Sequence, residues 1–268
     1  MSATIYLHEL RARLSSVLIW SLAVTAIVFF FMALFPGFSS QAALLNSLFA
    51  KMPQALRDAF GMNTDLSTLL GFYGFVFVFV QLCLAIQAGN YGFGLVSIEE
   101  SELTADFLLS KPVSRTQVMT SKLLAALTSL TITNLVVWAL TFLSVALFNS
   151  NHPYSNGTLI LILVSIVIFQ LFYLAVGLVI SLLVKRVRSV TSFSMALGFG
   201  TYVLSAFSAA LAAASLEYIT PFKHFDPGYI VRTGAYDTPL VLVNVAISVI
   251  SLAVSYWLYV RRDIPAVS

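Results

Sequence analysis

Six long runs without a charged residue are the feature that most limits how this chain can fold. None of the six contains Asp, Glu, Lys, Arg or His. A hydrocarbon layer of about 30 Å is crossed by roughly 20 helical residues, because each residue advances an α-helix by about 1.5 Å. Every run is long enough for one crossing, so the sequence predicts an all-α polytopic membrane protein with six transmembrane helices. The runs cover residues 14–35, 70–94, 123–148, 158–184, 190–216 and 239–260.

The composition excludes the common alternatives. Charged residues make up 9% of the 268 positions, whereas soluble domains carry about 25%. Disordered chains are poor in aromatic residues, but this chain has 22 Phe, 11 Tyr and 3 Trp. A membrane β-barrel needs alternating segments of about ten residues, which the sequence lacks. The net charge of +3 is too small and too scattered for a nucleic-acid partner, so we interpret residues 1–268 as a single transmembrane domain.

The distribution of Lys and Arg predicts the orientation. Basic residues concentrate in the cytoplasmic segments of membrane proteins. With the N-terminus in the cytoplasm, ten Lys and Arg residues fall on the inner side and four on the outer side. Both termini are therefore expected to be cytoplasmic, as an even number of spans requires. The sequence shows no organelle-targeting signal, so the bacterial or archaeal cytoplasmic membrane is the expected location.

The chain lacks the residues with which a transporter would power itself. Ion-coupled carriers usually hold ionisable side chains at membrane depth, and the six runs have none. There is no G-x-x-x-x-G-K-[ST] sequence, so no P-loop for ATP is expected. No cofactor or metal site is predicted, and His8, His152 and His224 are expected to be solvated loop residues. We conclude that the chain is not an enzyme by itself and that energy for transport comes from another subunit.

Several uncharged polar side chains lie within the runs. One interpretation is that they form hydrogen bonds between helices, each contributing about 0.6 kcal/mol. The other is that some of them line a substrate path, namely Gln81, Gln87, Asn90 and Asn134. Small residues between positions 205 and 215 predict close helix packing, within the chain or across a dimer.

The segment 99–122, between the second and third runs, has the most specific pattern. It reads EESELTADFLLSKPVSRTQVMTSK. Acidic residues, with apolar residues at helical spacing, predict a short amphipathic helix in its first half, which Pro112 ends. Ser114 and Gln117 match a capping box for a new helix that continues through Lys122 into the third run. A solvated turn between two spans is the alternative interpretation.

The second run belongs to a longer uncharged stretch. Residues 66–98 span about 50 Å if they form one helix. Such a helix must tilt or project beyond the lipid. Projection would carry Glu99 and Glu100 towards a soluble partner, whereas tilt alone requires no partner.

The loop resembles the cytoplasmic signature of ABC-2-type permeases, the membrane subunits of ABC transporters. The resembling pattern is an acidic pair, then TADFLLSKPVSR, then a lysine seven residues later. The basic amphipathic segment 5–13 and the sequence PFKHFDP at 221–227, expected in an outer loop, agree with this family. The resemblance covers essentially the whole chain.

This resemblance implies an assembly. Two six-helix permease halves, as a homodimer or heterodimer among membrane lipids, would rest on two separately encoded ABC-type ATPase subunits, which bind the ATP and Mg. The first half of the loop would be a coupling helix seated in the ATPase. The residues that the resemblance assigns to ATPase coupling are Glu99, Glu100, Thr104, Leu108, Leu109, Pro112, Arg115 and Lys122.

The expected function is therefore that of the permease subunit of an ATP-driven exporter. The absence of charge in the spans favours an amphipathic peptide, drug-like or lipid-like cargo. The alternatives are a membrane anchor or sensor that regulates an ATPase without transport, and a channel or carrier that acts alone. The predicted outer loop, 36–67, has apolar residues at helical spacing that predict a pair of short interfacial helices, which either gate a path or cap the bundle.

Overall fold

The computed structural model describes residues 2–53, 56–57, 64–101, 113–184, 186–211 and 214–261. All regular secondary structure in these ranges is α-helical. Six of the helices contain a stretch long and apolar enough to cross a membrane. The prediction of an all-helical chain with six candidate spans is confirmed. These helices are α1 (Ala3–Ser40), α4 (Leu69–Ser101), α6 (Arg115–Phe148), α7 (Asn156–Leu183), α8 (Val190–Leu211) and α12 (Thr238–Arg261).

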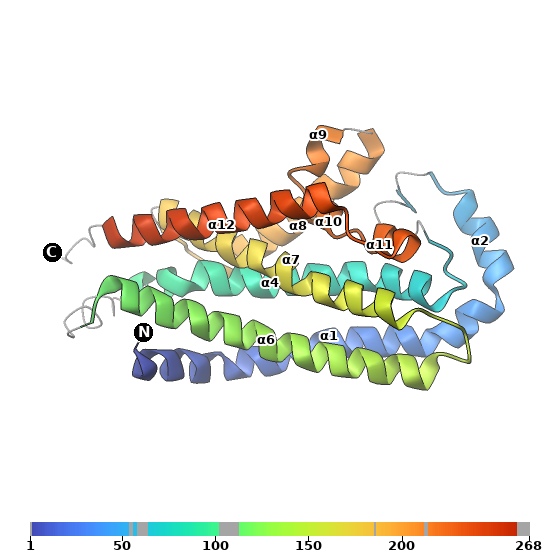
Figure 1. The fold of residues 1–268 in the computed structure, drawn as a ribbon, viewed down its shortest axis with the longest axis horizontal. Coiled ribbons are helices and arrows are strands. Elements are labelled where there is room, and N and C mark those ends of the chain that lie inside the picture. The colour runs from blue at the N-terminus through green and yellow to red at the C-terminus, as the bar shows by residue number, and fades with distance from the viewer. Residues whose placement is uncertain are drawn as a thin grey trace.

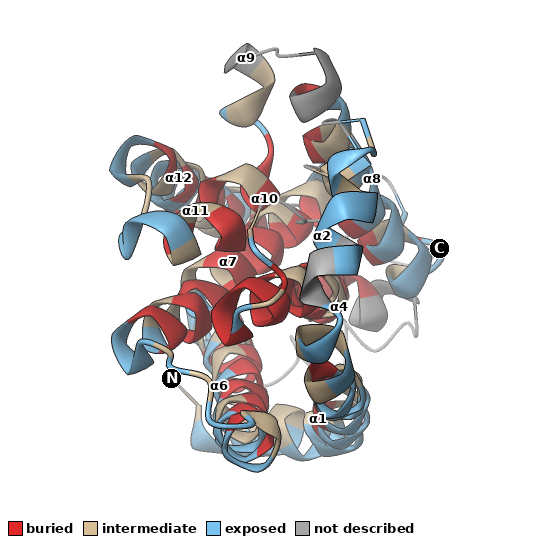
Figure 2. Ribbon diagram, turned by 90° about the vertical axis from the view of Figure 1, so that its right-hand side faces the viewer, coloured by how far each residue is buried: buried red, intermediate tan, exposed pale blue. Residues whose placement is uncertain are grey.

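Helix α4 is the central element of the bundle. In its most apolar stretch 78% of the residues are buried, against 17% in α8 and 22% in α12. It packs on α7, α8 and α1, while α1 also packs along α6 and α12 lies on α7 (Figure 1). Buried residues accordingly concentrate on α4, α7 and the inner face of α6, and exposed residues cover the outer helices (Figure 2). The apolar core is therefore organised around α4 and α7.

Glycine residues allow α4 and α7 to approach closely. A Cβ atom placed on Gly92 would overlap the carbonyl oxygen of Leu174 in α7. A Cβ on Gly177 would lie 3.3 Å from the carbonyl oxygen of Gly89 in α4. Small residues that let two backbones meet are the usual basis of helix packing in lipid, where no hydrophobic driving force favours association.

The two helices that flank the predicted coupling loop begin and end as the sequence suggested. Helix α4 runs as one unit of 33 residues through Glu99 and Glu100 to Ser101. The capping box at the start of α6 is confirmed, because the Gln117 backbone N–H donates to Ser114 Oγ and the Ser114 N–H donates to Gln117 Oε1, both at 3.2 Å. The first residue of α12 and the last of α7 lie near the predicted span limits.

The outer end of the bundle differs from the prediction. Helix α1 continues past Pro36 to Ser40, so this proline lies inside the last turns of the helix. Helix α2 (Ala42–Ala50) is the first of the two predicted short helices. The second was expected between residues 56 and 60, which lie largely outside the described residues. Asn46 Nδ2 in α2 donates to Asp65 Oδ1 at 3.0 Å and so ties α2 to the start of α4.

The fifth long helix is shorter than its uncharged run. Helix α8 ends at Leu211, not at residue 216. Three short helices follow: α9 (Ala214–Glu217), α10 (Pro221–His224) and α11 (Pro227–Thr233). The last two fold back against the bundle, since α10 contacts α8 and α12 and α11 contacts α4 and α7. Composition alone did not reveal the end of α8, because the run stays apolar to residue 216.

The expectation that His224 is a solvated loop residue is wrong. Its side chain is 1% exposed, and its Nδ1 atom lies 3.2 Å from Nδ2 of Asn244 in α12. The PFKHFDP segment that carries it forms α10 and the start of α11 and packs its phenylalanine rings against α7. His8 is exposed, and His152 is half-buried against the ring of Phe35.

The beginning of α1 and the end of α12 lie at the same end of the bundle, together with the end of α4 and the start of α6 (Figure 1). Helices α2 and α11 lie at the opposite end. An even number of crossings places the two ends of the chain on the same side of the bundle in this way. The assignment of the first end to the cytoplasm remains a prediction from the distribution of basic residues.

We predict that Gly92→Ala destabilises the protein. The added methyl group overlaps the Leu174 carbonyl, so α4 and α7 must separate, at a cost of about 1–3 kcal/mol. The thermal unfolding midpoint of the purified chain in detergent measures this effect. Gly200→Ala is the matched control, because no heavy atom lies within 4 Å of a Cβ at that position. Equal midpoints for the two variants would contradict the close approach of α4 and α7.

Candidate functional site

The candidate site is the end of the bundle where α4 stops and α6 starts. Glu99 and Glu100 occupy the last turn of α4, and Arg115 is the first residue of α6, where it is half-buried. Lys122 lies two turns farther along α6. The remaining residues assigned to ATPase coupling lie outside the described residues: Thr104, Leu108, Leu109 and Pro112.

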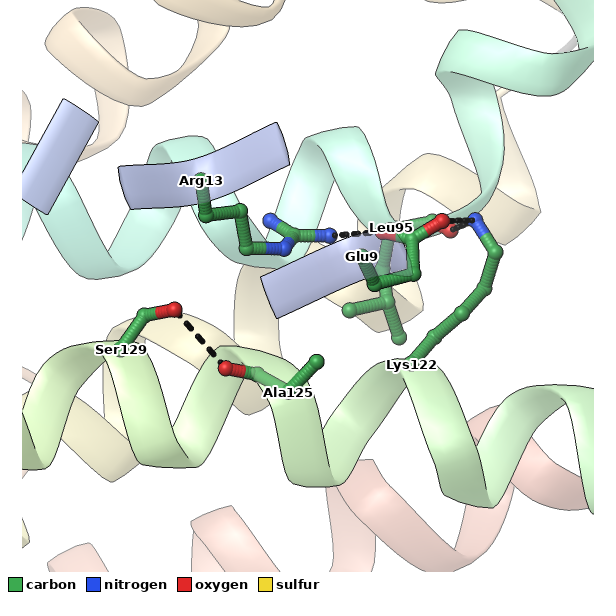
Figure 3. Close-up of polar contacts among 6 residues, drawn as sticks. All are labelled: Glu9, Arg13, Leu95, Lys122, Ala125 and Ser129. Carbon is green, nitrogen blue, oxygen red and sulfur yellow. Dashed lines mark hydrogen bonds and ion pairs between the residues drawn. The ribbon is translucent and has the colours of Figure 1, made fainter. Parts of the chain in front are cut away.

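The side chain of Lys122 points into the protein. It is 3% exposed, and its Nζ atom donates to the carbonyl oxygen of Leu95 at 2.8 Å. The same atom lies 3.2 Å from Glu9 Oε1, while Glu9 Oε2 accepts from Arg13 at 3.0 Å (Figure 3). The guanidinium carbon of Arg13 lies 5.2 Å from the centre of the Tyr91 ring. One charged cluster therefore joins α1, α4 and α6.

Each partner of this cluster follows from a local feature of its helix. Glu9 and Arg13 are four residues apart, so they lie on one face of α1 and form an ion pair. Leu95 lies in the last two turns of α4, and its carbonyl oxygen accepts a hydrogen bond from the buried ammonium group. A buried ammonium group needs such partners, because removal of a charge from water costs several kcal/mol.

The first turns of α1 contact α6 along the same seam. The backbone N–H of Ser2 donates to Ser121 Oγ at 2.8 Å. The hydroxyl groups of Tyr6 and Thr128 are 3.1 Å apart. The basic amphipathic segment 5–13 is thus part of the beginning of α1, which polar contacts of Ser2 and Tyr6, both before Glu9, hold to α6.

A buried polar network continues from the charged cluster into the bundle. Tyr91 donates to Ser16 in α1 at 3.2 Å, and Gln87 Nε2 lies 3.4 Å from the Tyr91 hydroxyl. Gln87 also donates to Thr133 Oγ1 at 2.9 Å. Gln170 Nε2 in α7 lies 3.4 Å from Gln87 Oε1. The network therefore links four helices, α1, α4, α6 and α7.

The four predicted path residues have different surroundings. Asn134 donates to Gln170 Oε1 at 2.8 Å and, with Gln87, belongs to the network. Gln81 donates to the carbonyl oxygen of Phe225 at 2.9 Å. Asn90 is half-buried, and its Oδ1 atom has no hydrogen-bond partner among the described residues. Three of the four thus form hydrogen bonds inside one chain, as the first interpretation expected, and a path-lining role stays a prediction.

Sequence reasoning missed three residues of this site: Glu9, Tyr91 and Thr133. The spacing of Glu9 and Arg13 was a usable signal for an ion pair. Nothing in the sequence, however, indicated that Lys122 would lie beside that pair. Metal-binding clusters of His, Cys, Asp and Glu were not found within the part of the chain that the structure describes.

The family model for an ABC-2 family transporter protein matches residues 3–264. This chain belongs to the ABC-2 family. The resemblance inferred from the loop is confirmed over nearly the whole sequence. No individual curated protein matches the sequence significantly.

Membership of the ABC-2 family defines the general role of the chain. It is a membrane component of an ABC transporter and not itself the ATPase. ABC-2 permeases typically pair with ATPase subunits. The end of the permease that carries Glu99, Glu100 and Arg115 is the natural candidate for that contact.

The burial of His224 predicts that acid destabilises the permease. Burial lowers the pKa of the His224 imidazole below its ordinary value of 6.5, so the unfolded chain binds the proton more readily than the folded chain. The folded state therefore has its full stability with respect to His224 above the unfolded-state pKa, and it loses stability as the pH falls below about 6.5. The unfolding midpoint in detergent, measured from about pH 7.5 to about pH 5, should fall.

His224→Gln should flatten this pH dependence, because glutamine does not titrate. His8→Gln is the matched control, since His8 is exposed and its substitution should leave the dependence unchanged. An unchanged slope in His224→Gln would show that other groups cause the loss of stability.

Proposed function

We propose that this ABC-2 permease is half of the membrane part of an ATP-driven exporter. Its cargo is an amphipathic peptide, drug-like or lipid-like compound. The observation that carries the proposal is the arrangement at one end of the bundle, where α4 continues past its apolar stretch to Glu99 and Glu100 and α6 restarts at a capping box. The segment between these two helices carries both acidic and basic residues, which suits a contact with a soluble ATPase.

Two permease halves and two ABC-type ATPase subunits complete the proposed assembly. The outer faces of α8 and α12 are consistent with a second permease half, because their large apolar side chains are not covered by this chain. Such faces are suited to contact with lipid or with another permease half. The exposed side chains include Met195, Phe199, Val203 and Phe207 on α8, and Leu242, Val249, Ile250 and Trp257 on α12.

In the proposed cycle, closure of the ATPase dimer on ATP displaces the loop at 99–122. Helix α4 transmits this displacement, because it is continuous from the loop to the outer end and packs on α1, α7 and α8. Movement of α1, α4 and α8 opens a route at the interface between the two halves. The uncharged character of this route suits an amphipathic molecule better than a bare ion.

We predict that Glu100→Lys and Arg115→Glu each weaken the complex with the ATPase. Reversal of one charge replaces an attraction at the contact by a repulsion, which costs several kcal/mol in a close pair. The measurements are the amount of ATPase that copurifies with the tagged permease, and ATP-dependent ethidium uptake by inside-out proteoliposomes. Both should fall at least tenfold, which corresponds to about 1.4 kcal/mol.

Arg188→Glu is the matched control. Arg188 is exposed between α7 and α8, so this variant makes the same change of charge as Arg115→Glu, but outside the predicted contact. Normal copurification and transport in both test variants would contradict the assigned contact. A stable complex that hydrolyses ATP but moves no ethidium, peptide or lipid probe would instead favour the anchor or sensor function.

A further inference from the structure

We propose that Glu9 and Lys122, seated on the carbonyl group of Leu95, form a clamp that makes α1 move together with the coupling loop. The clamp is a positioning device: it does not contact the ATPase but holds three helices in one register. This inference rests on the proposed function, because it concerns how a displacement of the loop reaches the rest of the permease.

The position of the contact carries the proposal. Leu95 lies one helical turn before Glu99, at the end of α4 that leads into the loop. Lys122 lies two turns after Arg115, at the start of α6 where the loop ends. The Nζ atom of Lys122 in α6 lies 2.8 Å from the Leu95 carbonyl oxygen in α4 and 3.2 Å from Glu9 Oε1 in α1 (Figure 3). The two helices that flank the loop, α4 and α6, are therefore joined to α1 at one point.

The contact is strong enough to act as a joint. The side chains of Lys122 and Glu9 are 4% and 18% exposed, so water competes weakly for them. Charge-assisted hydrogen bonds in such surroundings are stronger than neutral ones, and loss of one partner leaves the other charge buried and unpaired. Arg13 completes the arrangement, because it pairs with Glu9 and lies over the Tyr91 ring of α4.

The contacts of α1 change in character along its length. Near the loop they are directional, with Ser2 bonded to Ser121 and Tyr6 beside Thr128. Farther along, apolar side chains pack on α4, and the ring of Phe31 stacks on that of Phe79 at 5.9 Å. Hydrogen bonds fix a register, whereas apolar contacts are non-directional and tolerate sliding. The loop end of α1 is thus fixed by directional contacts, whereas its outer half packs on α4 through apolar side chains.

The first test is Glu9→Gln in the permease–ATPase complex. Glutamine keeps the shape of the side chain but removes its charge. The ATPase should still copurify, with an unchanged KM for ATP, because Glu9 is not among the residues assigned to the ATPase contact. The amount of ethidium transported per ATP hydrolysed should fall about fivefold or more, since a lost coupling of ordinary size has that effect. A merely structural defect would lower hydrolysis and transport together.

Arg11→Gln is the matched control, because Arg11 is exposed on the same segment of α1. This variant should transport as the wild type does. Unchanged transport per ATP in Glu9→Gln would overturn the proposal. The double variant Glu9→Gln with Lys122→Gln gives a second test. If its fold loss of transport per ATP equals the product of the two single losses, the two residues act independently and the proposal is overturned.

A covalent lock tests the clamp without loss of a charge. Ser2→Cys and Ser121→Cys, in a Cys83→Ser background, place two thiols beside the hydrogen bond that the Ser2 backbone N–H donates to Ser121 Oγ. The disulfide should form on oxidation, and transport should persist, because α1 and α6 move as one unit at this end. A transport block that is reversed by reductant would overturn the clamp, and so would failure of the two cysteines to cross-link.

The outcomes separate this inference from the proposed function. A wild-type complex with no ATP-dependent transport would contradict the exporter function itself. A wild-type complex that transports ethidium, with an unaffected Glu9→Gln variant, would contradict only the clamp.

Discussion

A lysine ammonium group buried in a helical bundle must find its partners inside the bundle, because water cannot reach it. In this ABC-2 permease the partners of Lys122 are the Glu9 carboxylate and the Leu95 carbonyl group. They lie on different helices, so their common contact fixes α1, α4 and α6 relative to one another. The remaining arrangement at this end, including the Arg13 and Tyr91 contact and the network around Gln87, extends from that joint.

Helix α4 connects this joint to the rest of the molecule. It is the most buried of the six candidate spans, and glycines at its contacts with α7 let the two backbones meet. Lipid offers no hydrophobic reason for helices to associate, so close packing and buried hydrogen bonds must supply the stability. A rigid central helix with a charged end is also a suitable element for transmitting a force from a soluble motor.

Local features were predictable. The six apolar runs, the capping box of Ser114 and Gln117 and the length of α4 all follow from neighbouring residues and were confirmed. Predictions failed where distant segments meet. His224 was expected in water, yet α10 folds back and places it against Asn244. Helix α8 also ends at Leu211, before the predicted limit of its run at residue 216.

The sequence by itself determined that the chain is a six-span helical membrane protein of the ABC-2 family, because uncharged length and a specific loop pattern are properties of contiguous residues. Only the tertiary structure decided that Lys122 faces inward and which groups neutralise it. Glu9 lies more than a hundred residues from Lys122 in the sequence, and Leu95 lies on a separate helix. Helical periodicity predicts which face of a helix a residue occupies, but only the packing of the helices determines which groups that face contacts.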